Sequence, residues 1–285
     1  MYSELLTQLQ AAQKELEPQL NALRASLMAL QRAIKLASAE KPEAFAMQKA
    51  LLKLQQAAKQ VENEHLQAAT NAFEHETQQA LNNLAFEFAR DLKQTFEQRG
   101  QSVSGRPPTL AIGPLLLQID MTARKGQWFY GKEPLTSPLP LSQSAILKRY
   151  DRQHKAIIER QIDTDAFLTE LHQAWQQLIN LRSHRPAGGR INIVETYSKV
   201  VMNRQSRRFW NAPSRKTFKE YPRQLFVRDL VLARASPTIT VQGKSYRLRL
   251  GVATKSQAGN PSRSIWLPEG AFEGQYYSDI TFEEL

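Results

Sequence analysis

The fold is decided first by residues 9–34, which read LQAAQKELEPQLNALRASLMALQRAI. Apolar residues recur in this stretch at spacings of three and four, namely Leu9, Ala12, Leu16, Leu20, Leu23, Leu27, Leu30 and Ile34. This spacing is the heptad seam of a coiled coil, and the intervening Gln, Ala, Glu and Lys residues favour helix. Two successive spacings of four leave an irregularity near Pro18. We therefore expect a long coiled-coil helix at the N-terminus.

A second long helix is expected after a break at residues 37–42, which read ASAEKP. Pro42 suits the first turn of a new helix, because its missing N–H would have no partner there. The pattern predicts one helix from about 42 to 99, roughly 85 Å long. Its seam includes Leu51, Leu54, Ala58, Val61, Ala68, Ala72, Leu84, Phe88 and Leu92. Residues 1–100 are thus predicted to form an antiparallel helical hairpin arm of coiled-coil type.

The first helix is shorter than the second, so part of the second helix would stay uncovered at about 75–99. This part holds Leu81, Leu84, Phe86, Phe88, Leu92 and Phe96. We expect it to pack on the C-terminal domain, on a second copy, or on another protein. A solvent-exposed spacer is the alternative. The sequence therefore predicts self-association or a protein partner for residues 1–100.

Beyond a linker at residues 100–108 the hydrophobic period changes from helix to strand. Residues 110–121 read as a hairpin around Gly113, and residues 128–130 as a further strand. Helices are expected after Ser142 or Ser144, after the caps at 163–165, and at 222–235. A hairpin follows at 238–250. The fold class is therefore α+β, with the helical arm at 1–100 and a mixed α/β globular domain at 101–285.

Charge is distributed unevenly along the chain. The formal net charge is +11. Residues 1–100 carry 11 Lys and Arg against 12 Asp and Glu, whereas residues 182–263 carry 18 against 3. Residues 264–285 hold five acids and no Lys or Arg. The C-terminal domain is therefore a basic domain with a short acidic C-terminal tail.

Basic residues mixed with aromatic and amide side chains are the candidate functional constellation. Lys and Arg neutralise phosphates and release counterions, which is the main sequence-independent term in nucleic-acid affinity. Aromatic rings can stack on unpaired bases or can form the core beneath the basic face. The candidate nucleic-acid-binding residues are Arg204, Arg207, Arg208, Trp210, Arg215, Lys216, Lys219, Arg223, Lys244, Arg247 and Arg249.

The helix at 222–235 and the hairpin bearing Arg247 and Arg249 together resemble a winged-helix arrangement. That resemblance covers about 60 residues, and it implies a helix in the major groove of DNA. The sequence therefore favours a non-enzymatic nucleic-acid-binding accessory protein, with DNA as the first candidate. Its arm would oligomerise or dock on a larger complex.

Two other functions stay open at this point. A basic block also suits an acidic protein or an anionic surface, and the acids at 264–285 can neutralise part of it within the same molecule. The chain would then be a coiled-coil scaffold. A metal-dependent nuclease needs clustered carboxylates to hold a divalent ion, for which Asp120, Glu195 and Lys199 are the best available trio.

Several chemistries find no support in the sequence. The chain has no cysteine, which excludes disulfides, thiolate ligands and a thiol nucleophile. Residues 243–245 lack the earlier glycine of a phosphate-binding loop, and Gln79 replaces the second His of a zinc-protease pattern that begins at His75. We expect no catalytic residues, metal or cofactor. With no signal peptide and no apolar span, we also expect a soluble, cytoplasmic protein without membrane contact.

Overall fold

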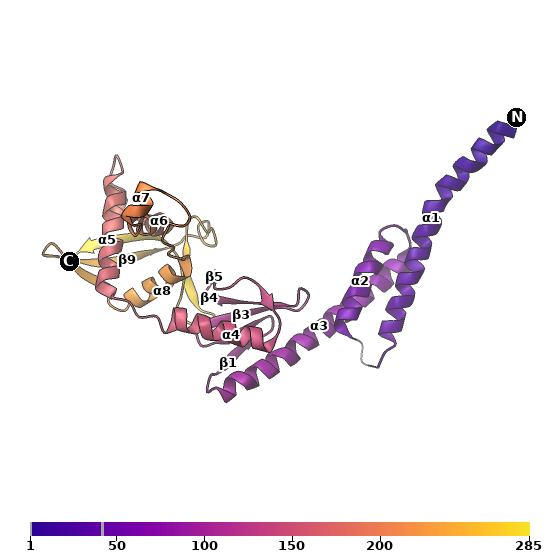
Figure 1. The fold of residues 1–285 in the computed structure, drawn as a ribbon, viewed down its shortest axis with the longest axis horizontal. Helices are drawn as coiled ribbons and strands as arrows, with labels where there is room; N and C mark the ends of the chain where they lie inside the picture. Colours follow the sequence, from indigo (N-terminus) through magenta and orange to yellow (C-terminus); the bar gives the residue numbers. More distant parts are fainter. Residues whose placement is uncertain (1, 41–42) are drawn as a thin grey trace. The chain divides into compact units, whose positions relative to one another are not determined.

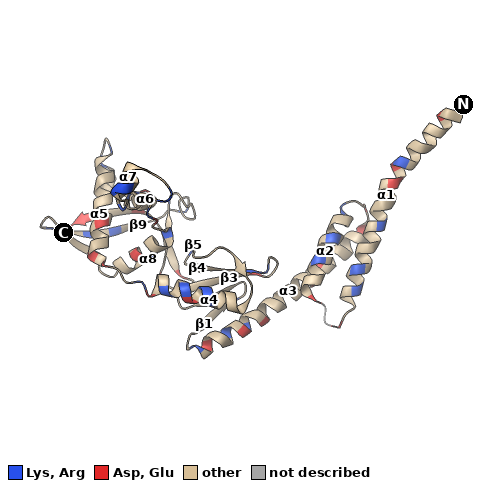
Figure 2. Ribbon diagram, viewed as in Figure 1, with Lys and Arg blue, Asp and Glu red and all other residues tan. Residues whose placement is uncertain are grey.

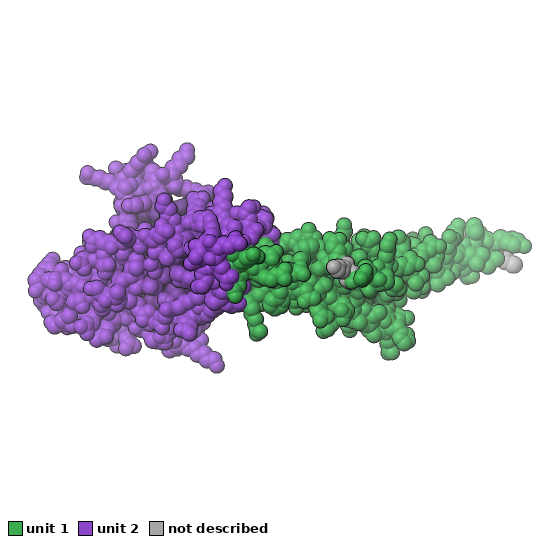
Figure 3. All heavy atoms as spheres, turned by 90° about the horizontal axis from the view of Figure 1, so that it is seen from below, with its two compact units in different colours: residues 1–94, 106–108, 119–125 green, residues 95–105, 109–118, 126–285 purple. Residues whose placement is uncertain are grey.

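A computed structural model describes residues 2–40 and 43–285, and the chain divides into two compact units (Figure 3). Unit 1 comprises Met1–Gln94, Arg106–Pro108 and Ile119–Lys125, and unit 2 comprises Thr95–Gly105, Thr109–Gln118 and Gly126–Leu285. The predicted α+β class is confirmed, with long helices first and antiparallel sheets with helices after them. Among the described residues, no helix is both long and apolar enough to cross a bilayer.

Unit 1 is built from three helices, α1 (Tyr2–Ala37), α2 (Ala44–Ala58) and α3 (Glu64–Gln98), the last of which ends in unit 2 (Figure 1). The predicted hairpin between the first two helices is confirmed. The prediction of one helix over 42–99 is wrong, because the chain leaves the helix after Ala58. Asn63 then starts α3, its side-chain oxygen accepting a hydrogen bond from the Leu66 N–H at 2.8 Å. The expectation for Pro42 lies outside the described residues.

The core of unit 1 uses a different face of α1 from the leucine seam. The buried residues of α1 are Ser26, Ala29 and Ala33, whose small side chains allow α2 to approach closely. Ala29 and Ala33 pack in one cluster with Met47, Ala50, Leu54, Ala57, Ala58, Leu66 and Phe73. Leu16 and Leu23, in contrast, are 60% and 50% exposed. Ala68 and Ala72, which were predicted for the seam, are exposed as well.

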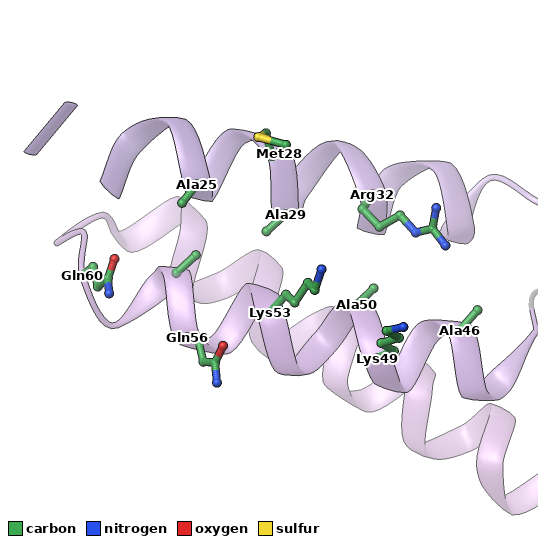
Figure 4. A pocket seen from close by; sticks show the side chains of 11 residues that line it. Ala25, Met28, Ala29, Arg32, Ala46, Lys49, Ala50, Lys53, Gln56 and Gln60 are labelled. Atoms are coloured by element: carbon green, nitrogen blue, oxygen red, sulfur yellow. The ribbon is translucent and has the colours of Figure 1, made fainter. Parts of the chain in front are cut away.

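A groove of about 730 Å³ lies between α1 and α2 (Figure 4). Alanines line it from both helices, and the cations Arg32, Lys49 and Lys53 surround it. Small side chains leave this space, because an alanine fills less volume than the leucines of an ordinary helix pair.

The first sheet contains β1 (Val103–Arg106), β2 (Thr109–Ile112), β3 (Leu115–Asp120), β4 (Lys125–Tyr130) and β5 (Glu133–Pro134) in that order, and β6 (Leu139–Pro140) pairs with β4. The predicted hairpin around Gly113 is confirmed by the register of β2 and β3. Phe96, near the end of α3, is fully buried and packs edge-on against Tyr150 and Trp128, with ring centroids 4.8 and 6.5 Å apart. The expectation that the end of the arm packs on the C-terminal domain is thus confirmed for this residue.

Capped helices follow the first sheet. Ser142 caps α4 (Gln143–Gln153) and Asp163 caps α5 (Thr164–Asn180), as predicted. A π-helical turn (His154–Ile158) extends α4, and a 3-10 turn (Ala187–Gly189) follows α5. The apolar stripe of α5 is buried, including Phe167, Leu168, Leu171, Trp175 and Leu178.

The second sheet has the order β10-β11-β9-β8, with β7 paired to β11. Its strands are β7 (Ile191–Asn192), β8 (Thr238–Val241), β9 (Lys244–Val252), β10 (Ile265–Pro268) and β11 (Gly274–Glu284), and the helices α6 (Ile193–Asn203), α7 (Arg207–Asn211) and α8 (Arg223–Ala233) lie between β7 and β8 in the chain. The helix at 222–235 and the hairpin at 238–250 are confirmed. The expected acidic tail is instead strand: β11 is an interior strand, paired with β10 and β7 as well as β9.

Candidate functional site

Residues 207–219, the basic segment, hold a group of exposed cations in unit 2. The segment consists of α7 and the turn after it, and Figure 2 shows the positive charge on α7. Among the described residues, no ion pair engages its five cations, which are Arg207, Arg208, Arg215, Lys216 and Lys219. These five side chains are therefore available to an external polyanion.

Gln205 fixes the two ends of the basic segment to each other. Its side chain is 7% exposed. The side-chain amide donates to the carbonyl oxygens of Val201 and Lys219 at 2.7 and 3.0 Å, and its oxygen accepts from the Lys219 N–H at 2.8 Å. The buried amide thus hydrogen-bonds to backbone groups before the segment and at its end. Without Gln205 these groups would need water molecules as partners.

Inside the segment the aromatic residues divide into supporting rings and one exposed ring. Phe209 packs edge-on against Phe218, with ring centroids 5.6 Å apart. Trp210 lies next to Phe209 but is 55% exposed. The two phenylalanines therefore support the segment, and Trp210 is the ring that remains accessible for stacking on a base. The sequence alone left both roles open for each of these rings.

Hydrogen bonds of a tight turn hold the middle of the segment. The Thr217 hydroxyl donates to the carbonyl oxygen of Ala212 at 3.0 Å, and the Phe218 N–H donates to the carbonyl oxygen of Ser214 at 3.0 Å. Arg215 and Lys216 lie between these residues. The turn therefore presents two neighbouring cations on a defined backbone rather than on a disordered loop.

A buried network anchors the chain immediately after the segment. The carboxylate of Asp229, 1% exposed, accepts hydrogen bonds from Arg160 at 2.6 and 3.0 Å and from the Tyr221 hydroxyl at 2.6 Å. The hydrogen bond to Asp229 raises the pKa of Arg160, and burial together with Asp229 raises the pKa of Tyr221. Tyr221 is therefore a core residue that ties the segment to α8.

Four of the predicted site cations are already paired with carboxylates of the same chain. Arg204 binds Glu170 through two hydrogen bonds of 2.7 and 2.6 Å. In the four pairs the shortest distance between a cation nitrogen and a carboxylate oxygen is 2.6 to 2.9 Å. The pairs are Arg204–Glu170, Arg223–Glu133, Lys244–Glu284 and Arg249–Glu283. The predicted cluster of eleven residues therefore does not form one free surface. The expected neutralisation by the C-terminal acids is seen at Lys244 and Arg249.

Strand pairing also defines the surroundings of the hairpin that bears Arg247 and Arg249. The hairpin β8–β9 is present, but β9 pairs along most of its length with β11, from Tyr246–Glu284 to Val252–Tyr277. The hairpin is therefore part of the second sheet. Arg247 is half-buried and lies opposite Glu283 in the register. The strand pairing does not test the winged-helix resemblance, which stays a prediction.

Sequence reasoning missed a second row of cations on α4 and the π-helical turn after it. Its members are Lys148, Arg149, Arg152 and Lys155, all exposed. Spacings of three and four residues place them on one side of a helix, and this spacing was the signal that could have revealed them. Figure 1 separates α4 from α7, so the row is a surface distinct from the basic segment.

The carboxylates considered for a nuclease are engaged by other groups. Glu195 pairs with Arg182 at 2.6 Å, and the Asp120 carboxylate accepts a hydrogen bond from the Ala123 N–H at 2.8 Å. Within residues 2–40 and 43–285, no group of three or more His, Asp or Glu side chains could hold a metal ion. His172 is buried against Trp175, Tyr246 and Phe282, and burial lowers its pKa. It serves the core of unit 2.

Comparisons of this chain with models of protein families, with curated proteins and with solved structures find no match.

Proposed function

We propose that this chain is a non-enzymatic nucleic-acid-binding accessory protein that binds the phosphate backbone through its basic segment, with DNA as the first candidate. The observation that carries the proposal is the contrast within unit 2. Its paired cations meet carboxylates of the same chain, whereas the five cations of the basic segment do not. A surface left positive on a fixed backbone suits a polyanion.

Phosphate binding explains why the segment is held so firmly. A flexible loop would lose conformational entropy on ordering against a ligand, and this would weaken binding. Here the clamp of Gln205 and the packing of Phe209 on Phe218 fix the backbone in advance. The helical arm of unit 1 fits the second part of the proposal, in which residues 1–100 bind a second copy or another protein.

Changing Arg207 and Arg208 to Ala is expected to weaken binding at all sequences alike. Each lost phosphate contact makes the negative slope of log K against log salt shallower by about 0.9 on double strands, and it lowers affinity by roughly eightfold at 0.1 M salt. Two contacts give a loss of roughly 60-fold. Fluorescence anisotropy with labelled DNA, titrated at several salt concentrations, measures both quantities.

The matched control removes two exposed cations that are already paired. Changing Lys244 and Arg249 to Ala alters the net charge equally, but Glu284 and Glu283 neutralise these side chains. We expect an affinity within about twofold of the parent. Equal losses in both variants, or no loss in either, would count against the basic segment. Binding to a polyglutamate peptide in place of DNA would favour the scaffold alternative.

Trp210 provides a separate test of strand type. Stacking of a base on an aromatic ring contributes about 1–3 kcal/mol and needs an unpaired base. Changing Trp210 to Ala is therefore expected to lower affinity for single strands by roughly tenfold, with little change for a duplex. The same anisotropy assay on oligo(dT) and on a hairpin duplex measures the difference. Equal effects on the two probes would exclude stacking as the role of this ring.

A further inference from the structure

The exposed face of α1 follows a heptad repeat without interruption. The seam residues are spaced alternately by four and three when position 13, rather than position 12, is counted among them. Nine of these ten residues are apolar, and the tenth is Gln13. The positions are Tyr2, Leu6, Leu9, Gln13, Leu16, Leu20, Leu23, Leu27, Leu30 and Ile34. In heptad notation Leu6 is an a position and Leu9 is a d position. The irregularity near Pro18 then disappears, and Pro18 falls at f, away from the seam.

Unit 1 leaves most of this seam uncovered, the exception being Leu30, which packs against the core cluster. Its core takes Ser26, Ala29 and Ala33 from the neighbouring c and g positions of α1, and the first half of α1 extends beyond α2 (Figure 1). Between residues 2 and 27 the seam holds seven large apolar side chains that are at least 48% exposed, namely Tyr2, Leu6, Leu9, Leu16, Leu20, Leu23 and Leu27. Contiguous apolar surface of this kind marks an interaction site.

We infer that the seam is the surface of a parallel two-stranded coiled coil with α1 of a second copy. The partner of the arm is then a second copy of this chain. The contribution of this dimer to nucleic-acid binding rests on the proposed function. A stable interface buries about 800 Å² per partner, and a seam of more than three heptads offers an area on that order. The period of 3.5 residues fits a helix of the same period, which a second α1 provides.

The charges of α1 permit this self-pairing. Residues 2–34 contain three acids, Glu4, Glu15 and Glu17, and three bases, Lys14, Arg24 and Arg32. None lies at an a, d or g position. In a parallel dimer the g residues Ala12 and Gln19 face the e residues Glu17 and Arg24 of the other copy, so no like charges meet. Two copies therefore associate without electrostatic repulsion along the seam.

Gln13 sets the orientation and register. In a parallel, in-register pair the two Gln13 amides lie opposite each other at an a layer and can hydrogen-bond. A full antiparallel overlap of the seam would instead place each Gln13 against Leu23 of the other copy, leaving its amide without a partner in an apolar layer. A single polar residue at an a position is a known determinant of register in coiled coils.

Light scattering on the full chain, free of nucleic acid, tests the association. We expect a mass of twice 32.5 kDa. Changing Leu16 and Leu23 to Asp should return the chain to 32.5 kDa. The matched control changes Met28 and Leu52 to Asp, two equally exposed apolar residues of unit 1 outside the seam, and should remain dimeric. A monomeric parent, or a control that dissociates equally, would overturn the inference.

Disulfide cross-linking tests the orientation and does not depend on a destabilised variant. The chain has no cysteine, so a single Leu9→Cys substitution introduces the only thiol. In the parallel dimer the two Cys side chains meet and mild oxidation joins the copies. In the antiparallel pair they would lie roughly 27 Å apart along the helix axis. Cross-linking of Leu9→Cys to Leu27→Cys chains, without the homotypic product, would overturn the parallel arrangement.

The two proposals fail separately. A chain that stays monomeric but still binds DNA with loss on changing Arg207 and Arg208 overturns the dimer and leaves the proposed function standing. A dimer that binds no nucleic acid overturns the proposed function and leaves the dimer standing. The Leu16 and Leu23 variant should also bind DNA more weakly than the parent, because the dimer presents two basic segments to one polyanion.

Discussion

Changing Asp229 to Ala is expected to lower the unfolding free energy of unit 2 by about 3 kcal/mol. The Asp229 carboxylate is almost completely buried and is the shared acceptor of Arg160 and Tyr221. Its removal leaves a guanidinium and a hydroxyl without their acceptor in the interior. Breaking a buried pair costs about 3–5 kcal/mol, and we expect the lower end because the Arg160 side chain is 29% exposed and can recruit water.

Tryptophan fluorescence in a urea titration isolates this effect. All four tryptophans, at 128, 175, 210 and 266, lie in unit 2, so the signal follows that unit and avoids the error of treating the whole chain as two-state. The control is Tyr221→Phe, which removes one hydrogen bond of the network and should cost about 1 kcal/mol. An Asp229→Ala loss no larger than that of the control would show that the network contributes little to stability.

Local signals allowed much of unit 2 to be predicted. Ser142 and Asp163 cap their helices, Gly113 and Gly243 turn their hairpins with positive φ, and the apolar spacing of α5 matches its buried face. Each of these features depends on a few neighbouring residues. Side chains that satisfy the backbone nearby leave the same signature in every fold, so sequence alone identifies them.

The arm shows the limit of periodicity. The apolar spacing predicted helices over 1–100, and this part of the chain is largely helical. The spacing could not show which face of α1 packs against α2. Here the smaller residues Ser26, Ala29 and Ala33 are buried, while most leucines of α1 are exposed. A leucine seam indicates that a helix needs a partner, and it does not say whether the partner belongs to the same chain. The break before α3 depended on the cap at Asn63, which the long apolar pattern obscured.

Long-range pairing decided which candidate site residues remain available. Arg223 meets Glu133, which lies 90 residues away in the sequence, and Arg249 meets Glu283 across two paired strands. No local pattern reports such contacts, because they follow from tertiary structure and strand register. The five cations of the basic segment differ from the paired cations in that the fold brings no carboxylate of the described residues to them. The sequence therefore identified the basic block, but it did not show that four of its predicted site cations are paired with carboxylates.

Neutralising the whole basic segment is expected to have the largest effect on binding. A variant with Ala at positions 207, 208, 215, 216 and 219 removes five phosphate contacts. The slope of log K against log salt should become shallower by about 4.5 on double strands or about 3.5 on single strands, since each contact contributes about 0.9 or 0.7. Affinity near 0.1 M salt should fall by at least roughly a thousandfold. The size of the change in slope thus reports how many of the five cations touch phosphate.

The control for that variant removes the same charge from a different surface. Changing Lys148, Arg149, Arg152, Lys155 and Lys255 to Ala takes away five exposed cations outside the basic segment and keeps Trp210. If binding depended on net charge alone, this control would lose as much affinity and slope as the first variant. Direct contact is short-ranged, whereas the field of a distant charge is screened within about 10 Å at 0.1 M salt. We therefore expect the control to keep most of its slope, and equal slopes would refute the assignment of the site.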